Sequence, residues 1–241
     1  TLFPYTTLFR SSFYDDTLKG GGGTNDKSLL SYFATHTESA IDWLYNHNIN
    51  LTDITATGGM SQKRAHRPND KSAVGSYLVK GLQKQLAYKQ IPLFDETEVI
   101  ALQKSTDRIT GLTVRNAEIG EKTIQAKAVL IAAGGFAQNR DMLAEYAPEL
   151  LDLKTTNHPG ATGDGMKLAT AVGGALVDMK KIQIHPTAQQ DTDHVYLIGE
   201  GVRGEGAVLV NRAGQRFVNE MTTRDKVTAA INDLQEDGAT L

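Results

Sequence analysis

Residues able to carry acid–base chemistry gather towards the C-terminal end of the chain. Glu200 and Arg203 are interleaved with glycines, a composition that disfavours a helix. A guanidinium presents a planar fork of N–H donors, so arginines in this setting suit recognition of a carboxylate. A buried arginine beside a carboxylate could also donate a proton, a role that its pKa above about 12 makes unusual. The full cluster comprises His185, Glu200, Arg203, Glu205, Arg212, Arg216, Glu220, Arg224 and Asp225. A solvated, salt-bridged surface explains the same residues equally well, and spacing alone leaves both interpretations open.

Two glycine-containing segments could bring the backbone close to a ligand. Residues 157–165 read NHPGATGDG and lead into a predicted helix at 166–172, whose N-terminus would attract an anionic or polar group. Residues 128–135 read AVLIAAGG and would allow close approach of a flat cofactor, although a plain tight turn explains them equally well. The GxGxxG dinucleotide fingerprint is absent, so a nicotinamide-dependent Rossmann enzyme is not supported.

Hydrophobic periodicity predicts the elements that must position these residues. Helices are predicted at 26–47, 73–89 and 224–234, and Asn25 or Asp26 could cap the first. Strands are predicted at 92–99, 99–102, 109–114, 123–133 and 181–186, with a hairpin-like segment at 208–218. The apolar end of the fourth strand suits a position covered on both faces, as in a parallel sheet. The predicted fold class is therefore α/β.

Composition excludes several classes of protein. The chain has 241 residues, a formal net charge of −3 and no cysteine, which excludes disulfides, thiolate metal sites and iron–sulfur ligation within it. The charge gives no indication of a nucleic-acid partner. The longest apolar stretch, 128–133, is too short to span a bilayer. No group of side chains has the spacing of metal ligands.

The two ends of the chain are unusual. Residues 1–11 read TLFPYTTLFRS, which resembles the translation of a sequencing adapter, and we expect this segment to be non-native. The chain begins without Met or a signal-peptide pattern and stops just after a predicted helix. We therefore interpret it as a piece of a longer protein, whose localisation and oligomeric state the sequence leaves open.

From about Ser12 onward, the chain carries a series of strings that occur together in one family. They are DDTLKGG, IDWL, GGMSQKRAHRP, VLIAAGGFAQN, HPGATGDGM, GGALVDM, IQIHPT, EGVRGEGAVLVNRAGQRFVNE and TTRD. In these strings, their order and their spacing, the chain resembles the flavoprotein subunits of the fumarate reductase and succinate dehydrogenase family. It looks most similar to the soluble fumarate reductases of the flavocytochrome c type.

The resemblance implies a fold and a division into domains. The family combines a Rossmann-like FAD-binding domain, with a parallel sheet and an antiparallel hairpin, and an inserted α+β capping domain. Here residues 12–179 would be part of the FAD-binding domain, without its N-terminal glycine fingerprint, and residues 180–241 the start of the capping domain. Substrate would bind between the two. We expect that this chain by itself neither holds FAD tightly nor turns over, because parts of both sites would lie outside it.

The resemblance also implies roles for individual residues. A hydride would pass from flavin N5 to one alkene carbon of fumarate, and Arg224 would protonate the other. Glu200 and Arg203 would form the relay that reprotonates Arg224. Substrate would be bound by His185, Gly199 and Glu200, with His185 holding a carboxylate. Fixed donors of this kind would stabilise developing charge and orient the acid.

The implied cofactor is non-covalent FAD, and the implied partner is a small dicarboxylate substrate. Val99 would contact the adenine side of the cofactor, and Ala133, Gly134 and Asp164 would provide further contacts. Haem or FMN would be encoded only outside this chain, and the electron donor is left open.

Two residues depart from the family pattern and leave the substrate open. Close fumarate reductases have Thr where this chain has Gly199 and Met where it has Leu197, and both positions line the substrate pocket. Reductases of urocanate or of acrylate- and cinnamate-type acids share the framework and stand as alternatives. An aspartate oxidase or ketosteroid dehydrogenase is a further alternative, the latter disfavoured because its substrate has no carboxylate. A non-catalytic flavin-binding or electron-shuttling module is disfavoured, because it would gain nothing from a proton relay.

Overall fold

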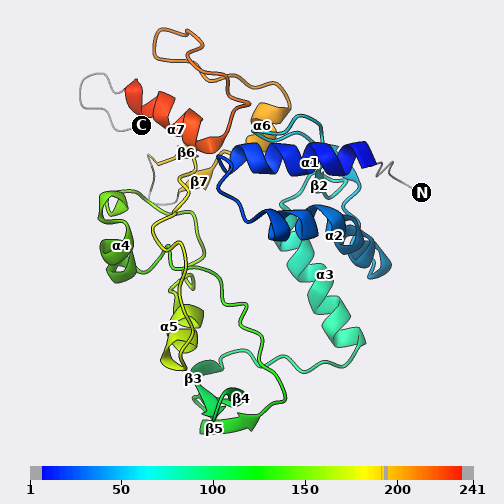
Figure 1. Cartoon of the computed structure of the whole chain (residues 1–241), viewed down its shortest axis with the longest axis vertical. Helices are drawn as coiled ribbons and strands as arrows, with labels where there is room; N and C mark the ends of the chain where they lie inside the picture. The colour runs from blue at the N-terminus through cyan, green and yellow to red at the C-terminus, as the bar shows by residue number, and fades with distance from the viewer. Residues whose placement is uncertain (1–6, 191, 193–194, 235–241) are drawn as a thin grey trace. The chain divides into compact units, whose positions relative to one another are not determined.

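The computed structural model describes residues 7–190, 192 and 195–234 (Figure 1). Its contacts group into two compact units. The first contains the described residues of Thr1–Pro92, Ile184–Thr187 and Ile198–Leu241, and the second those of Leu93–Gln183 and Ala188–Leu197. The domain division expected from the family resemblance, at residues 179 and 180, stays a prediction. Within the described part, no helix is both long and apolar enough to cross a membrane.

The first unit begins with two helices that pack against each other, α1 (Thr7–Gly20) and α2 (Lys27–Asn46) (Figure 1). The helix predicted at 26–47 is confirmed by α2, which begins where the side chain of Asp26 accepts hydrogen bonds from two backbone N–H groups of the first turn. α1 was not predicted. Residues 7–11 of the segment expected to be non-native lie within it, and residues 1–6 lie outside the described part.

A small hairpin and a third helix complete the N-terminal part of this unit. β1 (Asp53–Thr55) pairs antiparallel with β2 (Ala65–Arg67). α3 (Val74–Tyr88) confirms the helix predicted at 73–89. Ile49, 1% exposed, lies against α3 at Gly81, where an added Cβ would be 2.7 Å from its side chain. A glycine at this position therefore lets the helix approach the chain that leads into β1.

The C-terminal part of the first unit contains α6 (Glu200–Gly204) and α7 (Arg224–Asp233). α7 confirms the predicted helix at 224–234, although no side chain caps its N-terminus. The glycines around Glu200 were expected to disfavour a helix, and this expectation is wrong, because these residues form the single turn of α6. The predicted hairpin-like segment contains a bridge between Val210 and Arg216 around a turn at 211–214.

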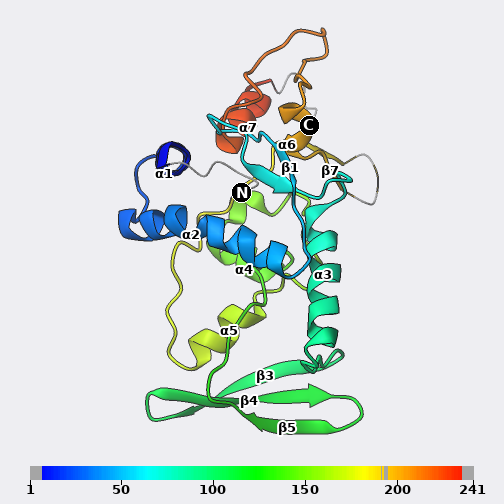
Figure 2. The ribbon, with the colours of Figure 1, turned by 90° about the vertical axis from the view of Figure 1, so that its right-hand side faces the viewer.

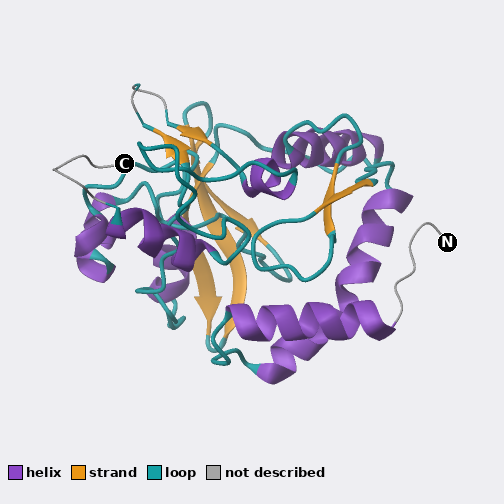
Figure 3. Cartoon of the chain, turned by 90° about the horizontal axis from the view of Figure 1, so that it is seen from above, coloured by secondary structure: helices purple, strands orange, loops and turns teal. Residues whose placement is uncertain are grey.

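The second unit is built on a three-stranded antiparallel sheet in the order β3 (Glu98–Ser105), β4 (Arg108–Asn116), β5 (Gly120–Gln125), and Figures 2 and 3 show these long strands side by side. The predicted hairpin around residues 105–108 is confirmed by β3 and β4. Its other elements are α4 (Arg140–Tyr146), η1 (Pro148–Leu150), α5 (Asp164–Ala171) and the pair β6 (Ala188–Gln189) and β7 (Tyr196–Leu197). α5 confirms the helix predicted at 166–172.

The mixed helix–strand class is as predicted, but the parallel sheet is not found within the described residues, where every strand pairing is antiparallel. The strand predicted at 123–133 ends with β5, and the apolar residues beyond it are unpaired, with Leu130 91% exposed. A strand of a parallel sheet needs neighbouring strands as well as cover on both faces, and among the described residues no strand pairs with this run. Of the strand predicted at 92–99, only Glu98 and Val99 belong to a strand, β3, and the strand predicted at 181–186 is absent from the described structure.

Candidate active site

One carboxylate, that of Glu200, lies at the centre of the predicted site in the first unit. Arg224 donates a hydrogen bond through Nε to Glu200 Oε1. Arg203 Nη2 lies 3.7 Å from the same oxygen, and His185 Nε2 lies 3.5 Å from Oε2. The structure thus brings together four of the predicted residues, which come from α6, α7 and the chain before β6.

Burial differs among these four side chains in a way that matters for chemistry. The side chain of Arg203 is 3% exposed, Glu200 13% and His185 15%, whereas Arg224 is 38% exposed. Glu200 and Arg203 are therefore enclosed, and Arg224 is the member of the group that solvent or a ligand reaches most readily. A ligand bound at Arg224 would contact a guanidinium that is itself held by the enclosed carboxylate of Glu200.

The electrostatics of the site keep Glu200 ionised. Burial by itself raises the pKa of Glu200, but the hydrogen bond from Arg224, a backbone N–H and the charges of Arg224 and His185 outweigh it. The net effect lowers the pKa of Glu200 from 4.5 to about 2. The carboxylate is consequently an acceptor at neutral pH and holds the guanidinium of Arg224 in place.

This pKa predicts a pH-dependent contribution to stability. A depressed carboxyl pKa stabilises the fold fully above the unfolded value of 4.5, and the stabilisation is lost as pH falls towards about 2. The difference in free energy of unfolding between the parent and Glu200→Gln should therefore be constant above about pH 5. It should shrink by about 3 kcal/mol between pH 4.5 and about 2. Urea unfolding of both proteins at several pH values measures it. Glu118→Gln, at an exposed turn position, is the matched control, and a pH-independent difference would contradict the assignment.

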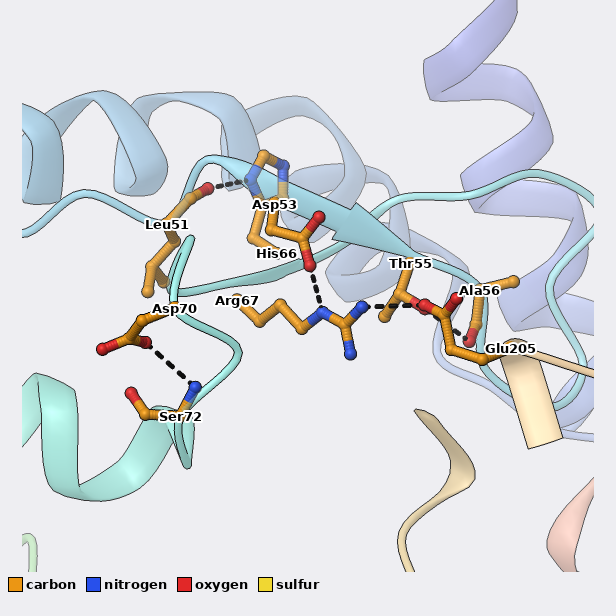
Figure 4. Close-up of polar contacts among 9 residues, drawn as sticks. All are labelled: Leu51, Asp53, Thr55, Ala56, His66, Arg67, Asp70, Ser72 and Glu205. Carbon is orange, nitrogen blue, oxygen red and sulfur yellow. Dashed lines mark hydrogen bonds and ion pairs between the residues drawn. The ribbon is translucent and has the colours of Figure 1, made fainter. Parts of the chain in front are cut away.

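α6 is seated by close contact with the residue after β1 and by one ion pair from β2. An added Cβ at Gly204 would overlap the carbonyl oxygen of Ala56, so only glycine allows this approach. Arg67 pairs through Nε with Asp53, and its Nη2 lies 2.7 Å from Glu205 Oε1, just beyond the end of α6 (Figure 4). Arg67 therefore links the hairpin to the helix that carries Glu200 and Arg203.

A second glycine contact fixes the residues that precede Arg224. Gly59 N donates a 2.8 Å hydrogen bond to Met221 O. An added Cβ at Gly58 would lie 2.5 Å from Thr222 O, and Gly59 has a φ of +81°. The loop after β1 thus holds the main chain that enters α7, where Arg224 is the first residue.

His185 is oriented by its own loop. Its Nδ1 lies 3.0 Å from Thr187 O and 3.3 Å from Thr187 N. Thr187 is in turn joined to Ile198, because Oγ1 donates to Ile198 O at 2.7 Å and Ile198 N donates to Thr187 O at 3.1 Å. These bonds hold the His185 segment beside the start of α6, so its Nε2 faces Glu200.

Gly199, predicted to bind substrate, is the residue immediately before α6. Its backbone is extended (φ −66°, ψ 157°), and an added Cβ would meet no atom within 4 Å. No feature of the local fold therefore requires glycine at this position. The absence of a side chain leaves open space next to Glu200.

The residues predicted to contact the cofactor lie in the second unit. Gly165, in the first turn of α5, packs so closely on the preceding apolar run that an added Cβ would lie 2.6 Å from Ile131 and 3.1 Å from Ala133. Asp164 is the first residue of α5 and accepts a 2.6 Å hydrogen bond from Thr162 Oγ1. The structure therefore brings Ala133 beside the start of α5, where Asp164 lies.

The backbone here is open enough for a flat cofactor. Gly134 has a φ of +77°, and an added Cβ at Gly134 or Gly135 would meet nothing within 4 Å. With the N-terminus of α5 adjacent, these residues fit the close approach of FAD. Val99 lies apart from them in β3, opposite Val114 in β4.

The sequence analysis did not assign several residues that shape the site. Gly58, Gly59 and Arg67 appeared only within one of the family strings, residues 58–68, and Asp53 was not singled out. Glu220 and Arg216 were in the charged cluster but received no role. The contacts that Arg67 makes with Glu205 and that Gly59 makes with Met221 join residues far apart in the sequence, so nothing in the local sequence indicates them.

An open glycine turn that admits a flat cofactor and an arginine–carboxylate site for an acidic substrate are features that a flavin-dependent oxidoreductase requires. The chain belongs to the family described as "FAD binding domain", whose sequence model matches residues 10–240. This match confirms the predicted family of flavoproteins.

Individual proteins are similar to nearly the whole of this chain, but this chain matches only part of each of them. The NADH:fumarate oxidoreductase of Klebsiella pneumoniae (strain 342) is 47% identical over 224 residues, which are 93% of this chain and 24% of that protein. The fumarate reductase (cytochrome) of Shewanella frigidimarina is 41% identical over 219 residues, 90% of this chain and 38% of that protein. The open conformation of a flavocytochrome c3 fumarate reductase matches with a TM-score of 0.77 and 35% identity, covering 95% of this chain and 40% of that one. The chain thus spans between a quarter and two fifths of the length of these proteins.

Proposed function

We propose that the protein reduces the carbon–carbon double bond of an unsaturated dicarboxylate, with fumarate as the first candidate and succinate as its product. The observation that carries this proposal is the contact of Arg224 with an enclosed, ionised Glu200 that also faces Arg203 and His185. Similarity to proteins named as fumarate reductases supports the same conclusion. An idle binding module would have no use for an enclosed carboxylate held among two arginines and a histidine.

FAD, when bound, supplies the hydride that adds to one alkene carbon. We propose that Ala133, Gly134 and Asp164 hold the cofactor together with Val99. The remaining chemistry falls to the chain's own side chains. Arg224 gives a proton to the other alkene carbon, so that one hydride and one proton together convert the alkene into a saturated acid.

The other members of the cluster prepare Arg224 and the substrate for this step. Glu200 accepts the Nε–H of Arg224, which fixes the guanidinium and stabilises its charged form before and after reaction. Arg203, enclosed beside Glu200, completes a path by which a proton returns to Arg224. His185 and the backbone at Gly199 lie at the rim of this group, where they would hold a substrate carboxylate.

The direct test uses the full-length protein loaded with FAD. Anaerobic oxidation of a reduced viologen dye is followed with fumarate, urocanate and an acrylate as acceptors. Turnover with fumarate supports the proposal. Turnover with another acid alone would keep the reaction type and change the substrate, and no turnover with any of them would contradict the function.

A second candidate substrate class, larger unsaturated acids such as urocanate, is favoured by the open space at Gly199. Gly199→Thr would fill this space and add a hydroxyl at the N-cap of α6. If a larger acid occupies the space, the variant should lose about 10-fold or more in kcat/KM for that acid. Fumarate turnover should be maintained. Equal effects on all acids would show that Gly199 does not select the substrate.

A further inference from the structure

Glu220 lies outside the proposed catalytic group, yet it is almost completely enclosed, with 5% of its surface exposed. Its carboxylate receives two hydrogen bonds from Arg216, from Nη2 to Oε1 at 2.8 Å and from Nε to Oε2 at 3.1 Å. Bidentate pairs of this kind fix the orientation of a carboxylate. The side chain of Glu220 is therefore anchored to the turn segment at 208–216.

The main chain of the same residue contacts the proposed relay. Arg203 Nη1 donates a 2.8 Å hydrogen bond to Glu220 O, and both residues are buried. Among the described residues, Arg203 Nε and Nη2 have no hydrogen-bond partner, and Nη2 is 3.7 Å from Glu200 Oε1. The carbonyl of Glu220 is thus the group that determines where the guanidinium of Arg203 points.

Met221 and Thr222, which follow Glu220, are held by the loop after β1. Met221 O accepts the 2.8 Å hydrogen bond of Gly59, and Thr222 O lies against Gly58. The short segment 220–222 is therefore tied to Arg203, to the 208–216 turn segment and to the loop after β1. Arg224 begins α7 only two residues beyond this segment.

We infer that Glu220 is a positioning residue that aligns Arg203 and Arg224 on Glu200, acting through its own main chain and its ion pair with Arg216. This inference rests on the proposed function for its kinetic consequences, but not for its structural ones. Loss of the carboxylate would release the anchor, let the Glu220 carbonyl move and misalign both arginines. Small misplacement of reacting groups has large kinetic effects, because productive geometry is narrow.

The test compares Glu220→Ala, Glu220→Gln and Arg216→Ala in the full-length, FAD-loaded protein. Glu220→Ala should lower kcat per bound flavin by about 10²-fold with little change in KM, since His185 and its loop are untouched. The solvent deuterium isotope effect on kcat should increase, because proton delivery becomes slower. Glu220→Gln should recover much of the loss, because the amide keeps an oxygen acceptor for Arg216. Arg216→Ala should fall between the two, and Glu118→Ala at an exposed position is the control.

Hydrogen–deuterium exchange of the 219–228 peptide gives a second readout that needs no turnover. Faster exchange in Glu220→Ala than in the parent is expected. If the parent reduces none of the acids tested, the proposed function fails while the exchange still tests the positioning role. Unchanged exchange, or an activity loss explained by lower flavin content with an unchanged isotope effect, would overturn the inference. If Glu220→Ala does not fold, the same comparisons apply to Glu220→Gln and Arg216→Ala.

Discussion

Replacing Arg224 with alanine is expected to lower kcat by about 10²–10⁴-fold, the usual contribution of a positioned general acid. Arg224 is the most exposed member of the cluster, and its Nε–H is engaged by Glu200. Its side chain, 38% exposed, is therefore the one of the four that a ligand reaches most readily. Arg203 is too enclosed to take over this role, with a side chain only 3% exposed.

The measurement is steady-state viologen oxidation at saturating acid, expressed per bound flavin. Normalisation is needed because loss of Arg224 leaves the Glu200 carboxylate short of a partner, which costs about 1–3 kcal/mol of stability. Arg224→Lys should recover only part of the activity, because an ammonium group lacks the planar fork. Arg212→Ala, an exposed arginine of the same region, is the matched control. A kcat within a few-fold of the parent in Arg224→Ala would remove Arg224 from the mechanism.

The second large effect is expected at Gly204, which carries no functional group. An added methyl would overlap the backbone oxygen of Ala56, and backbone in a hairpin cannot rotate away as a side chain can. Gly204→Ala must therefore displace α6, with Glu200 and Arg203, from β1. Overpacking of this kind costs about 1–3 kcal/mol. Activity should fall together with stability, because the displaced helix carries the carboxylate that holds Arg224.

The same helix contains the control for this experiment. An added Cβ at Gly201 would lie 3.7 Å from Arg67 Nη1, an ordinary contact with the end of a flexible side chain. Gly201→Ala makes the same chemical change within one turn of helix and should leave stability and turnover near the parent values. Thermal unfolding and viologen oxidation of both variants give the answer. Equal behaviour of the two variants would show that the Gly204 contact does not seat α6.

Elements with a strong local pattern could be predicted from the sequence. The apolar periodicity of 26–47 and the cap at Asp26 specify α2 through contacts within a few residues. The hairpin of β3 and β4 follows equally from its alternating residues and turn. α6 could not be predicted, because its glycines disfavour a helix and packing against Ala56 overrides that preference.

Sequence spacing alone also does not predict that the residues of the candidate site come together. Glu200 and Arg203 are on one helical turn, but Arg224 and His185 are brought to them by contacts of other segments, among them those of Gly59 and Thr187. The family resemblance, not the residue pattern, led to this group. The expected parallel sheet is not found among the described residues for a related reason, because an apolar run forms a sheet strand only where other strands lie beside it.

The ion pair between Arg67 and Glu205 has a consequence for the order of events during synthesis. These residues are 138 positions apart, so at ordinary translation rates roughly 10–30 s separate their appearance. Asp53 lies opposite Arg67 in the first hairpin and pairs with it directly. In the newly made hairpin, Asp53 therefore pairs with the charged guanidinium of Arg67 until α6 and Glu205 are synthesised. The late partner, Glu205, adds a second contact to a hairpin that already holds Arg67 through Asp53, so α6 can dock there only after most of the chain has been made.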